Sequence, residues 1–323
     1  MNKRVYGVLG ISSIMANWNA DFSGYPKTIS DGTTFGSDKA LKYPMKKMWE
    51  NEGKKVLYIK SMKLDTNKSN EVNLIPCTLQ ERYDKLFPDE TLDKNKDSKK
   101  VLTNLFQAID VKNFGATFAV GGNNISITGA VQIGQGFNKY EDTEPQTQQI
   151  LSPFRDPGAR EKAEKKGKEA EEARNSTLGT KIVSDEAHYF YPFAINPLAY
   201  KEYIELGTTE GYTEEDYEMF KQASLSAATS YATNAKEGCE NEFAIFVETQ
   251  PDLYLPNLTE YITFSKGGAS DGKNIIKVAC DDMLNDVSDR LLSVEVYYNP
   301  YTTQLDTNIK GAKYINIITK KEV

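Results

Sequence analysis

Apolar residues along the chain fall into short blocks, and the spacing within a block differs from one block to the next. Val5–Ile11 is a continuous apolar run, which is typical of a buried strand. From Gly36 to Trp49 the apolar positions recur at helical spacing, and Val56–Met62 is again rich in β-forming residues. The N-terminal part of the chain therefore predicts a strand, a helix and a second strand.

The next blocks contain the start signals of two helices. Thr78 and Glu81 have the spacing of a capping box, so we expect a short helix from there to about Leu86, after a polar loop at Asp65–Asn73. Ser98 is in position to cap another helix. The apolar stripe of this second helix would consist of Val101, Leu102, Leu105, Phe106 and Ile109.

Two strand-like runs follow these helices. Lys112–Val120 and Asn124–Ile133 are joined at Gly121–Asn123, which has the turn chemistry of a β-hairpin. The resulting order, strand–helix–strand and then helix–strand–strand, is that of a split βαβ unit. We therefore predict an α+β fold with a ferredoxin-like core.

The periodic pattern stops between Gly134 and Thr177. A connection of this length inside a compact domain is uncommon and indicates either a functional projection or disorder. The tract from Arg160 to Arg174 mixes both signs of charge with helix-forming residues, which favours a solvated, mobile helix. A small apolar patch before this tract either docks on the core or is exposed to meet a partner, and it consists of Ile150, Leu151 and Phe154.

Strand-like sequence resumes from Leu178 to Pro197, where several aromatic residues cluster, including Tyr189 and Tyr191. Such side chains usually pack in a core; alternatively, one face of the strand stacks on nucleobases. Thr213 then caps a helix that we expect to run to about Tyr231. Four further strands are predicted at Phe243–Glu248, Leu258–Phe264, Ile275–Val278 and Leu292–Tyr298.

The helix predicted after Gly36 has an apolar face and a cationic face. Its polar side carries a stripe of three lysines, Lys39, Lys42 and Lys46. The opposite side would be buried through Leu41, Pro44, Met45, Met48 and Trp49. Ser37 or Asp38 can cap the first turn, and Pro44 predicts a short or kinked helix. Spacing alone favours an ordinary solvated lysine face.

The stretch before this helix changes that interpretation. It is rich in turn-forming residues and hydrogen-bond donors, among them Asn17, Asn19 and Lys27. Residues 1–63 carry 11 Lys/Arg and 5 Asp/Glu, a net charge of +6, whereas the rest of the chain carries −13. A strand, a polar loop and a lysine-faced helix would bring several cations to one surface. A polyanionic partner is thus expected only at the N-terminal part.

Composition limits the class of protein. A length of 323 residues with 39% hydrophobic content predicts a globular chain of one elaborated domain or two, and no apolar run is long enough for a membrane span. Three scattered cysteines and a single histidine argue against a disulfide framework or a zinc site and fit a reducing cytoplasm. A cluster of aspartates near Asp281 indicates a solvated helix end rather than a metal site.

Motifs of the common enzyme classes are missing from the sequence. It contains no phosphate-cradling glycine loop, no nucleophile elbow and no His/Cys metal set. Asp21, Asp31 and Asp38 could coordinate Mg²⁺ in a nuclease, although aspartates are common in turns and caps for local reasons. Because no convergent acid–base pair can be named, we predict a non-catalytic protein without a cofactor or a metal.

Several segments carry a resemblance that goes beyond composition. They are Val5–Ile11, Ala16–Asp21, Phe35–Lys42, Phe114–Gly115, Thr177–Thr180 and Tyr191–Pro197. Their order and spacing over roughly residues 4–200 resemble the backbone subunit of type I CRISPR effector complexes (Cascade), most closely that of subtype I-B. Thr213–Asp216 and Glu242–Glu248 resemble the I-B group more weakly.

This resemblance implies a modified RRM-like, ferredoxin-like palm with large insertions called fingers and thumb. Residues 1–323 would form one elaborated domain, with the thumb at 137–176 and a finger or helical insertion at 64–100. Copies would stack head to tail in a helical filament along a CRISPR guide RNA, in contact with other subunits of the complex. They would present the guide for pairing with target DNA.

The resemblance also implies which residues contact RNA. The backbone-binding positions of the family fall on the loop after the first strand, on the lysine-faced helix and at the root of the thumb. They are Asn17, Asn19, Lys27, Ser37, Lys39, Lys42, Lys46, Lys47, Thr180 and Lys181. Tyr189 would touch RNA or a neighbouring subunit. The apolar wedge that kinks the guide would be formed by Ile150, Leu151 and Phe154.

Two other hypotheses stay open. The first is a metal-dependent, RNA-cutting relative, as in type III effector complexes, in which Asp21 or Asp38 would serve cleavage. The second is an acidic scaffold protein that binds no nucleic acid.

Overall fold

The computed structural model describes residues 1–68, 70–94, 97–151, 178–267 and 272–323. At the centre of this part of the chain is a nine-stranded sheet with the order β16-β14-β11-β1-β10-β8-β2, in which β7 and β9 also pair with β10. Its strands are β1 Arg4–Ala16, β2 Phe35–Gly36, β7 Val131–Ile133, β8 Gly136–Asn138, β9 Pro145–Leu151, β10 Leu178–Ile195, β11 Cys239–Thr249, β14 Leu291–Tyr298 and β16 Lys313–Asn316.

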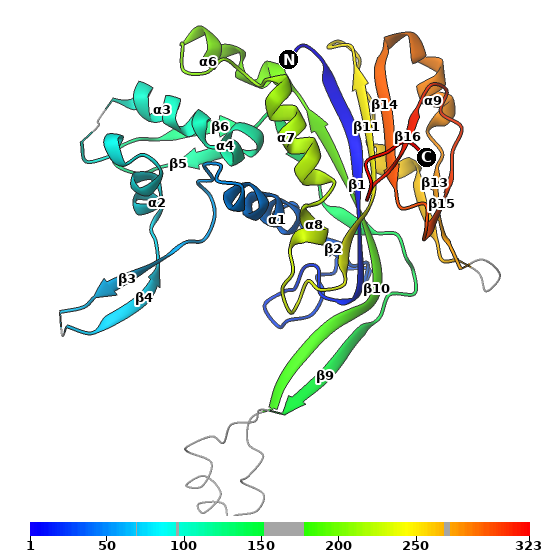
Figure 1. Cartoon of the computed structure of the whole chain (residues 1–323), viewed down its shortest axis with the longest axis horizontal. Helices are drawn as coiled ribbons and strands as arrows, with labels where there is room; N and C mark the ends of the chain where they lie inside the picture. Colours follow the sequence, from blue (N-terminus) through cyan, green and yellow to red (C-terminus); the bar gives the residue numbers. More distant parts are fainter. Residues whose placement is uncertain (69, 95–96, 152–177, 268–271) are drawn as a thin grey trace, which may run out of the picture.

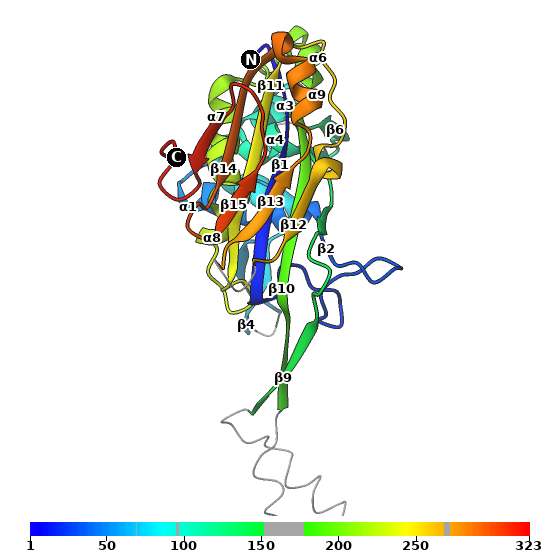
Figure 2. The ribbon, with the colours of Figure 1, turned by 90° about the vertical axis from the view of Figure 1, so that its right-hand side faces the viewer.

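Different layers cover the two faces of this sheet (Figures 1 and 2). On one face lie three helices, α1 Asp38–Asn51, α7 Glu214–Ser224 and α8 Ala227–Ser230. On the other face lies a three-stranded sheet with a short helix, formed by β12 Ile262–Ser265, β13 Asn274–Val278, β15 Thr303–Asp306 and α9 Asp281–Asp286. The central strands are therefore buried on both sides.

Burial on both sides explains the continuous apolar run at the start of the chain. Leu9 belongs to the core on the helical side of the sheet, whereas its neighbour Val8 belongs to the core on the other side. In β10, Tyr191 and Phe190 are divided in the same way. Side chains alternate along a strand, so a strand with cores on both sides needs apolar residues at every position.

The rest of the helical side forms a lobe next to α1 (Figure 1). It contains two hairpins, β3 Met62–Thr66 with β4 Val72–Pro76 and β5 Gly115–Phe118 with β6 Ile125–Thr128. Its helices are α2 Leu79–Leu86, α3 Ser98–Gln107, α4 Ile109–Phe114 and α6 Lys201–Glu205. Short 3-10 turns complete the described chain at Pro88–Glu90, Pro197–Tyr200, Leu258–Tyr261 and Ser288–Arg290.

Several predicted elements are confirmed. The fold is a mixed α+β arrangement around a large sheet, and the first strand and the lysine-bearing helix are present. The predicted hairpin exists as β5 and β6, but it is shorter than predicted, because Lys112–Phe114 ends α4 and Val131–Ile133 is β7, which pairs with β10. The capping box is complete, because Glu81 N–H donates to Thr78 Oγ1 over 3.2 Å and Thr78 N–H donates to Glu81 Oε2 over 2.8 Å.

The strand predicted at Val56–Met62 is wrong. Up to Ser61 this segment is irregular chain whose backbone groups bond to side chains instead of a neighbouring strand. The Asp110 carboxylate accepts 2.8 Å hydrogen bonds from the N–H groups of Leu57 and Tyr58, and Arg82 donates to the Val56 carbonyl. These side chains replace the ladder that a strand would need.

The polar loop predicted at Asp65–Asn73 is also wrong, because both of its ends belong to the β3–β4 hairpin. Met62, Leu64, Val72 and Leu74 alternate with more polar residues in the two strands. Period-two alternation of this kind is the signal of a strand with one apolar face.

Other element boundaries differ from the prediction. Asp97, not Ser98, caps α3, and the stripe from Val101 to Ile109 is divided between α3 and α4. The helix predicted to reach Tyr231 ends at Ser224, and Asn241 Oδ1 accepts from the N–H groups of Ala228 and Thr229 in the separate helix α8. The first half of Leu258–Phe264 is a 3-10 turn.

The aromatic cluster of β10 packs in the core. Tyr189 is 1% exposed and Tyr191 is 0% exposed. The alternative that these rings stack on nucleobases is therefore wrong, and the predicted contact of Tyr189 with RNA or a neighbouring subunit is wrong for the same reason.

Candidate nucleic-acid interface

The loop before α1 fixes where that helix begins. Ser37 is its N-cap, and Ser37 Oγ accepts a 3.3 Å hydrogen bond from Ala40 N–H. Ser37 is itself held by Asn19, whose Oδ1 accepts from the Ser37 N–H over 2.7 Å and from the Ser37 hydroxyl over 2.6 Å. The cap is thus tied to the loop that follows β1.

Close packing around Tyr191 brings this cap against the sheet. A Cβ on Gly36 would lie 1.7 Å from Tyr191 Oη, and a Cβ on Gly136 would lie 2.4 Å from the same ring. The indole N–H of Trp18 donates to Tyr191 Oη. Only residues without a side chain fit at these two positions, so Tyr191 locks the start of α1 onto β10.

Burial of one side of α1 stabilises the helix by more than its internal proline destabilises it. The helix continues through Pro44 to Asn51, so the predicted short helix is not observed. Leu41, Met45 and Trp49 are at most 1% exposed. Burial of such side chains contributes about 1.5–3 kcal/mol each, which together exceeds the roughly 3 kcal/mol cost of a proline inside a helix.

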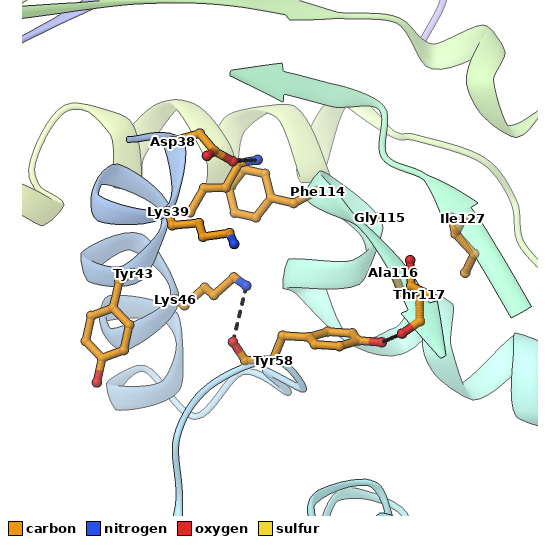
Figure 3. A pocket seen from close by; sticks show the side chains of 11 residues that line it. Asp38, Lys39, Tyr43, Lys46, Tyr58, Phe114, Gly115, Ala116, Thr117 and Ile127 are labelled. Atoms are coloured by element: carbon orange, nitrogen blue, oxygen red, sulfur yellow. Dashed lines mark hydrogen bonds and ion pairs between the residues drawn. The ribbon is translucent and has the colours of Figure 1, made fainter. Parts of the chain in front are cut away.

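The opposite side of α1 faces a groove of about 510 Å³, which we call the α1 groove. One wall carries Lys39, Lys42 and Lys46 from α1, and the other is formed by Phe114 at the end of α4 and by Gly115–Thr117 and Ile127 of the β5–β6 hairpin. Tyr58 lies between the walls, with its hydroxyl donating to the Thr117 carbonyl over 2.7 Å (Figure 3). The groove therefore combines amines with apolar and aromatic surface.

The three amines of the groove have different surroundings. Lys39 is exposed and has no carboxylate partner among the described residues. Lys42 Nζ lies 2.9 Å from Asp38 Oδ2 and 5.0 Å from the centre of the Phe114 ring. Lys39 thus lies at the exposed rim of the groove, whereas the Lys42 side chain is 15% exposed and would exchange its Asp38 partner for a phosphate.

Lys46 already has two partners within the protein. Its side chain is 16% exposed, and its Nζ donates to the Tyr58 carbonyl over 3.2 Å and lies 3.7 Å from Asp110 Oδ2. Burial lowers the pKa of Lys46, and the Asp110 carboxylate offsets part of that effect. Burial and the same carboxylate raise the pKa of Tyr58 to about 12. Lys46 thus stabilises the residues at the bottom of the α1 groove.

Other predicted contact residues do not line this groove. Lys27 is half-buried on the preceding loop, and Lys47 forms a 2.8 Å ion pair with Glu50. Asn17 is buried, and its Nδ2 donates to the carbonyls of Gly24 and Ile182. Asn17 and Asn19 therefore use their amides to hold the loop in place.

The predicted thumb-root residues lie on a separate ribbon. Thr180 and Lys181 belong to the part of β10 that pairs with β9 and extends away from the body of the molecule (Figure 1). Ile150 lies on the same ribbon and is 49% exposed. Phe154, the side chain of Leu151 and the charged tract at 160–174 lie outside the described residues.

Sequence reasoning missed the far wall of the groove. The sequence singled out Phe114 and Gly115 only through the family resemblance, and it placed Tyr58 in a predicted strand. Periodicity along one helix carries no information about which distant segment faces it, so Ile127 had no signal at all. A cationic helix face followed by an aromatic-rich hairpin was the nearest available signal.

Candidate metal ligands are not gathered within the described residues, where no group of three His, Cys, Asp or Glu side chains is placed to hold an ion. Asp21 accepts hydrogen bonds from Ser23 and Tyr25, and Asp31 accepts one from Thr33. These bonds lower the pKa of both carboxyl groups and explain the aspartates as turn formers. None of the helices in the described ranges has the length and apolarity of a transmembrane span.

Comparisons with known proteins identify the family. A solved chain described as "CRISPR RNA-guided surveillance complex, pre-nicking" matches with a TM-score of 0.52 and 13% identity over 97% of this chain and 96% of that chain, which shows a shared fold. The comparison with curated proteins found no match. The family model described as "CRISPR-associated protein Cas7" matches residues 3–281. The chain therefore belongs to the Cas7 family, as its segments predicted.

Proposed function

We propose that this protein is the guide-RNA-binding backbone subunit of a type I CRISPR effector complex, of the I-B subtype that its segments resemble, and that it acts in the cytoplasm. The observation that carries the proposal is the α1 groove, where three lysines from one helix face an aromatic and apolar wall. The similar solved chain, by its description, belongs to an RNA-guided complex, and this supports the same class of partner.

The central sheet supports an RRM-like palm. The strands β11-β1-β10-β8 are neighbours in that order, and the pairs β11–β1, β1–β10 and β10–β8 are antiparallel. Helix α1 follows β1, and α7 follows β10. This order of strands and helices supports the proposal of a ferredoxin-like palm. Residues 64–100 would then be a finger insertion and residues 137–176 the thumb.

In this proposal Lys39 and Lys42 bind phosphates of the guide, and the aromatic wall accommodates the sugar–base side. Contacts to phosphate carry no sequence information, which suits a subunit that must accept any guide. Lys46 and Ser37 position the site, together with Asn17 and Asn19. Lys27, Lys47, Thr180 and Lys181 would contact the RNA as it continues along the molecule.

The β9–β10 ribbon would carry the thumb, with Ile150, Leu151 and Phe154 as a wedge between bases. Copies would follow one another along the guide, together with other subunits of the complex, and base pairing with target DNA would supply sequence specificity. The subunit itself would be non-catalytic, because Asp21 and Asp31 serve turns and Asp38 forms an ion pair with Lys42.

The salt dependence of RNA binding tests this function. We expect the double variant Lys39→Ala/Lys42→Ala to bind single-stranded RNA more weakly, with the slope of log K against log salt reduced by about 1.4, since each phosphate contact contributes about 0.7. The matched control is Lys54→Ala/Lys310→Ala, which removes the same charge from two exposed positions outside the groove. Equal slopes for both double variants would contradict the proposal.

A further inference from the structure

The α1 groove contains a carboxylate beside its amines. Asp38 lines the groove together with the three lysines, and its side chain is 26% exposed. One of its oxygens, Oδ2, accepts a 2.9 Å hydrogen bond from Lys42 Nζ, and no donor among the described residues reaches the other oxygen, Oδ1. Figure 3 shows the Asp38 carboxylate on the same side of α1 as the amines of Lys39 and Lys46. The carboxylate can therefore accept further hydrogen bonds from a ligand in the groove.

Local structure alone does not require a carboxylate at this position. The hydroxyl of Ser37 already caps α1, and an ion pair between residues four apart adds little to the stability of a helix. For a phosphate that binds Lys42, the carboxylate is a competitor for the amine and a like charge. A strand in the groove must therefore offer Asp38 a hydrogen-bond donor, because otherwise the repulsion between the two anions is unopposed.

The chemistry of nucleic acids limits what this donor can be. Phosphate and ring oxygens of the backbone are acceptors, and the donors on the bases change from one base to the next. A subunit that accepts any guide cannot depend on base donors. The ribose 2′-hydroxyl is a donor that every nucleotide of RNA carries beside its phosphate, and DNA lacks it.

We propose that Asp38 determines the specificity of the α1 groove for RNA over single-stranded DNA, by accepting a hydrogen bond from a ribose 2′-hydroxyl. This inference rests on the proposed function. When Lys42 exchanges Asp38 for a phosphate, the hydroxyl beside that phosphate replaces the amine as the donor to the carboxylate. DNA brings the same phosphate without the donor, so the carboxylate stays unpaired and repels it.

This selectivity suits a complex that handles both nucleic acids. A subunit that presents guide RNA to target DNA must keep the DNA strand out of the groove that holds the guide. Phosphate contacts alone cannot do so, because the phosphates of the two polymers are alike. A site built to pair with a hydroxyl rejects a ligand without that hydroxyl, since its own polar group is then left unpaired.

Binding of chemically altered strands of one sequence tests the inference. Fluorescence anisotropy measures the Kd of single-stranded RNA, DNA and 2′-fluoro RNA, which keeps the sugar shape of RNA but has no donor at C2′. We expect the wild type to bind RNA roughly 10- to 100-fold more tightly than DNA, as for the loss of one hydrogen bond to a charged group. We expect 2′-fluoro RNA to bind as weakly as DNA, within about threefold.

The variant Asp38→Asn removes the charge and keeps the size of the side chain. We expect it to bind DNA about tenfold more tightly than the wild type and RNA within about threefold, so that the preference for RNA falls. A gain in DNA affinity is not what a damaged fold would produce. The matched control is Asp89→Asn, which removes an exposed carboxylate outside the groove and is expected to keep the full preference.

The outcomes separate failure of this inference from failure of the proposed function. An unchanged preference in Asp38→Asn, or equal binding of RNA and 2′-fluoro RNA by the wild type, would overturn the role of Asp38 alone. A wild type that binds neither RNA nor DNA would overturn the proposed function. The titrations are made in EDTA and repeated with Mg²⁺, and a preference that requires Mg²⁺ would contradict the inference, because Asp38 would then act through a metal ion.

Discussion

Lysines on the same face of one helix have different roles in this structure. The stripe of Lys39, Lys42 and Lys46 is readable from sequence spacing because it depends only on the geometry of α1. The sequence does not predict that Lys46 already has a partner, because Asp110 lies 64 positions further along the chain. Sequence therefore predicts the row of amines but not which of them is available to a ligand.

The single histidine shows the same limit. His188 is 1% exposed, with Nδ1 at 2.8 Å from Glu242 and Nε2 at 3.1 Å from Glu186. Lys266 pairs with Glu186 from the other side, and the His188 ring stacks on Phe264 at 3.7 Å. Burial alone would lower the pKa of His188, but the two carboxylates outweigh burial and raise it.

This raised pKa predicts a pH dependence of stability. The folded state holds the proton more tightly than the unfolded state, so its contribution is complete below the ordinary histidine pKa of about 6.5 and is lost as the pH rises above that value. We expect the melting temperature of the wild type to fall between pH 6 and pH 8 and that of His188→Gln to be lower but flatter. Parallel profiles of the two proteins in calorimetry would exclude this role.

At the scale of elements, predictions that depend on neighbouring residues are confirmed, whereas a prediction that depends on a distant contact is wrong. The capping box at Thr78, the cap at Thr213 and the β5–β6 turn depend on neighbouring residues, and they are present as expected. The segment before β3 resembles a strand but depends on Asp110, which lies beyond two helices in sequence. Such a segment cannot be assigned without knowledge of its distant partner.

Asp110 therefore offers a test of how the groove floor is built. Its side chain is 1% exposed and accepts from two backbone N–H groups. Asp110→Ala would leave both donors unpaired and is expected to cost about 3 kcal/mol of unfolding free energy. Denaturant unfolding measures the change, with the exposed Asp89→Ala as the control. Equal midpoints for the two variants would show that the carboxylate does not hold this segment.

At the scale of the whole molecule, one sheet with different layers on its two faces places the α1 groove and the β9–β10 ribbon on a common frame. Strand content and the mixed fold class followed from alternation and apolar runs. The placement of the β5–β6 hairpin against α1, and of the three-stranded sheet on the opposite face, depends on contacts between distant segments, so it could not be predicted from local pattern.

Ultraviolet cross-linking of the RNA-bound protein, followed by mass spectrometry of the attached peptides, tests the central claim most directly. The account predicts RNA adducts on peptides that contain Tyr43, Tyr58 or Phe114, which line the α1 groove. It also predicts that these adducts decrease in Lys39→Ala/Lys42→Ala. Adducts confined to the opposite face, on β12, β13 or β15, would contradict it.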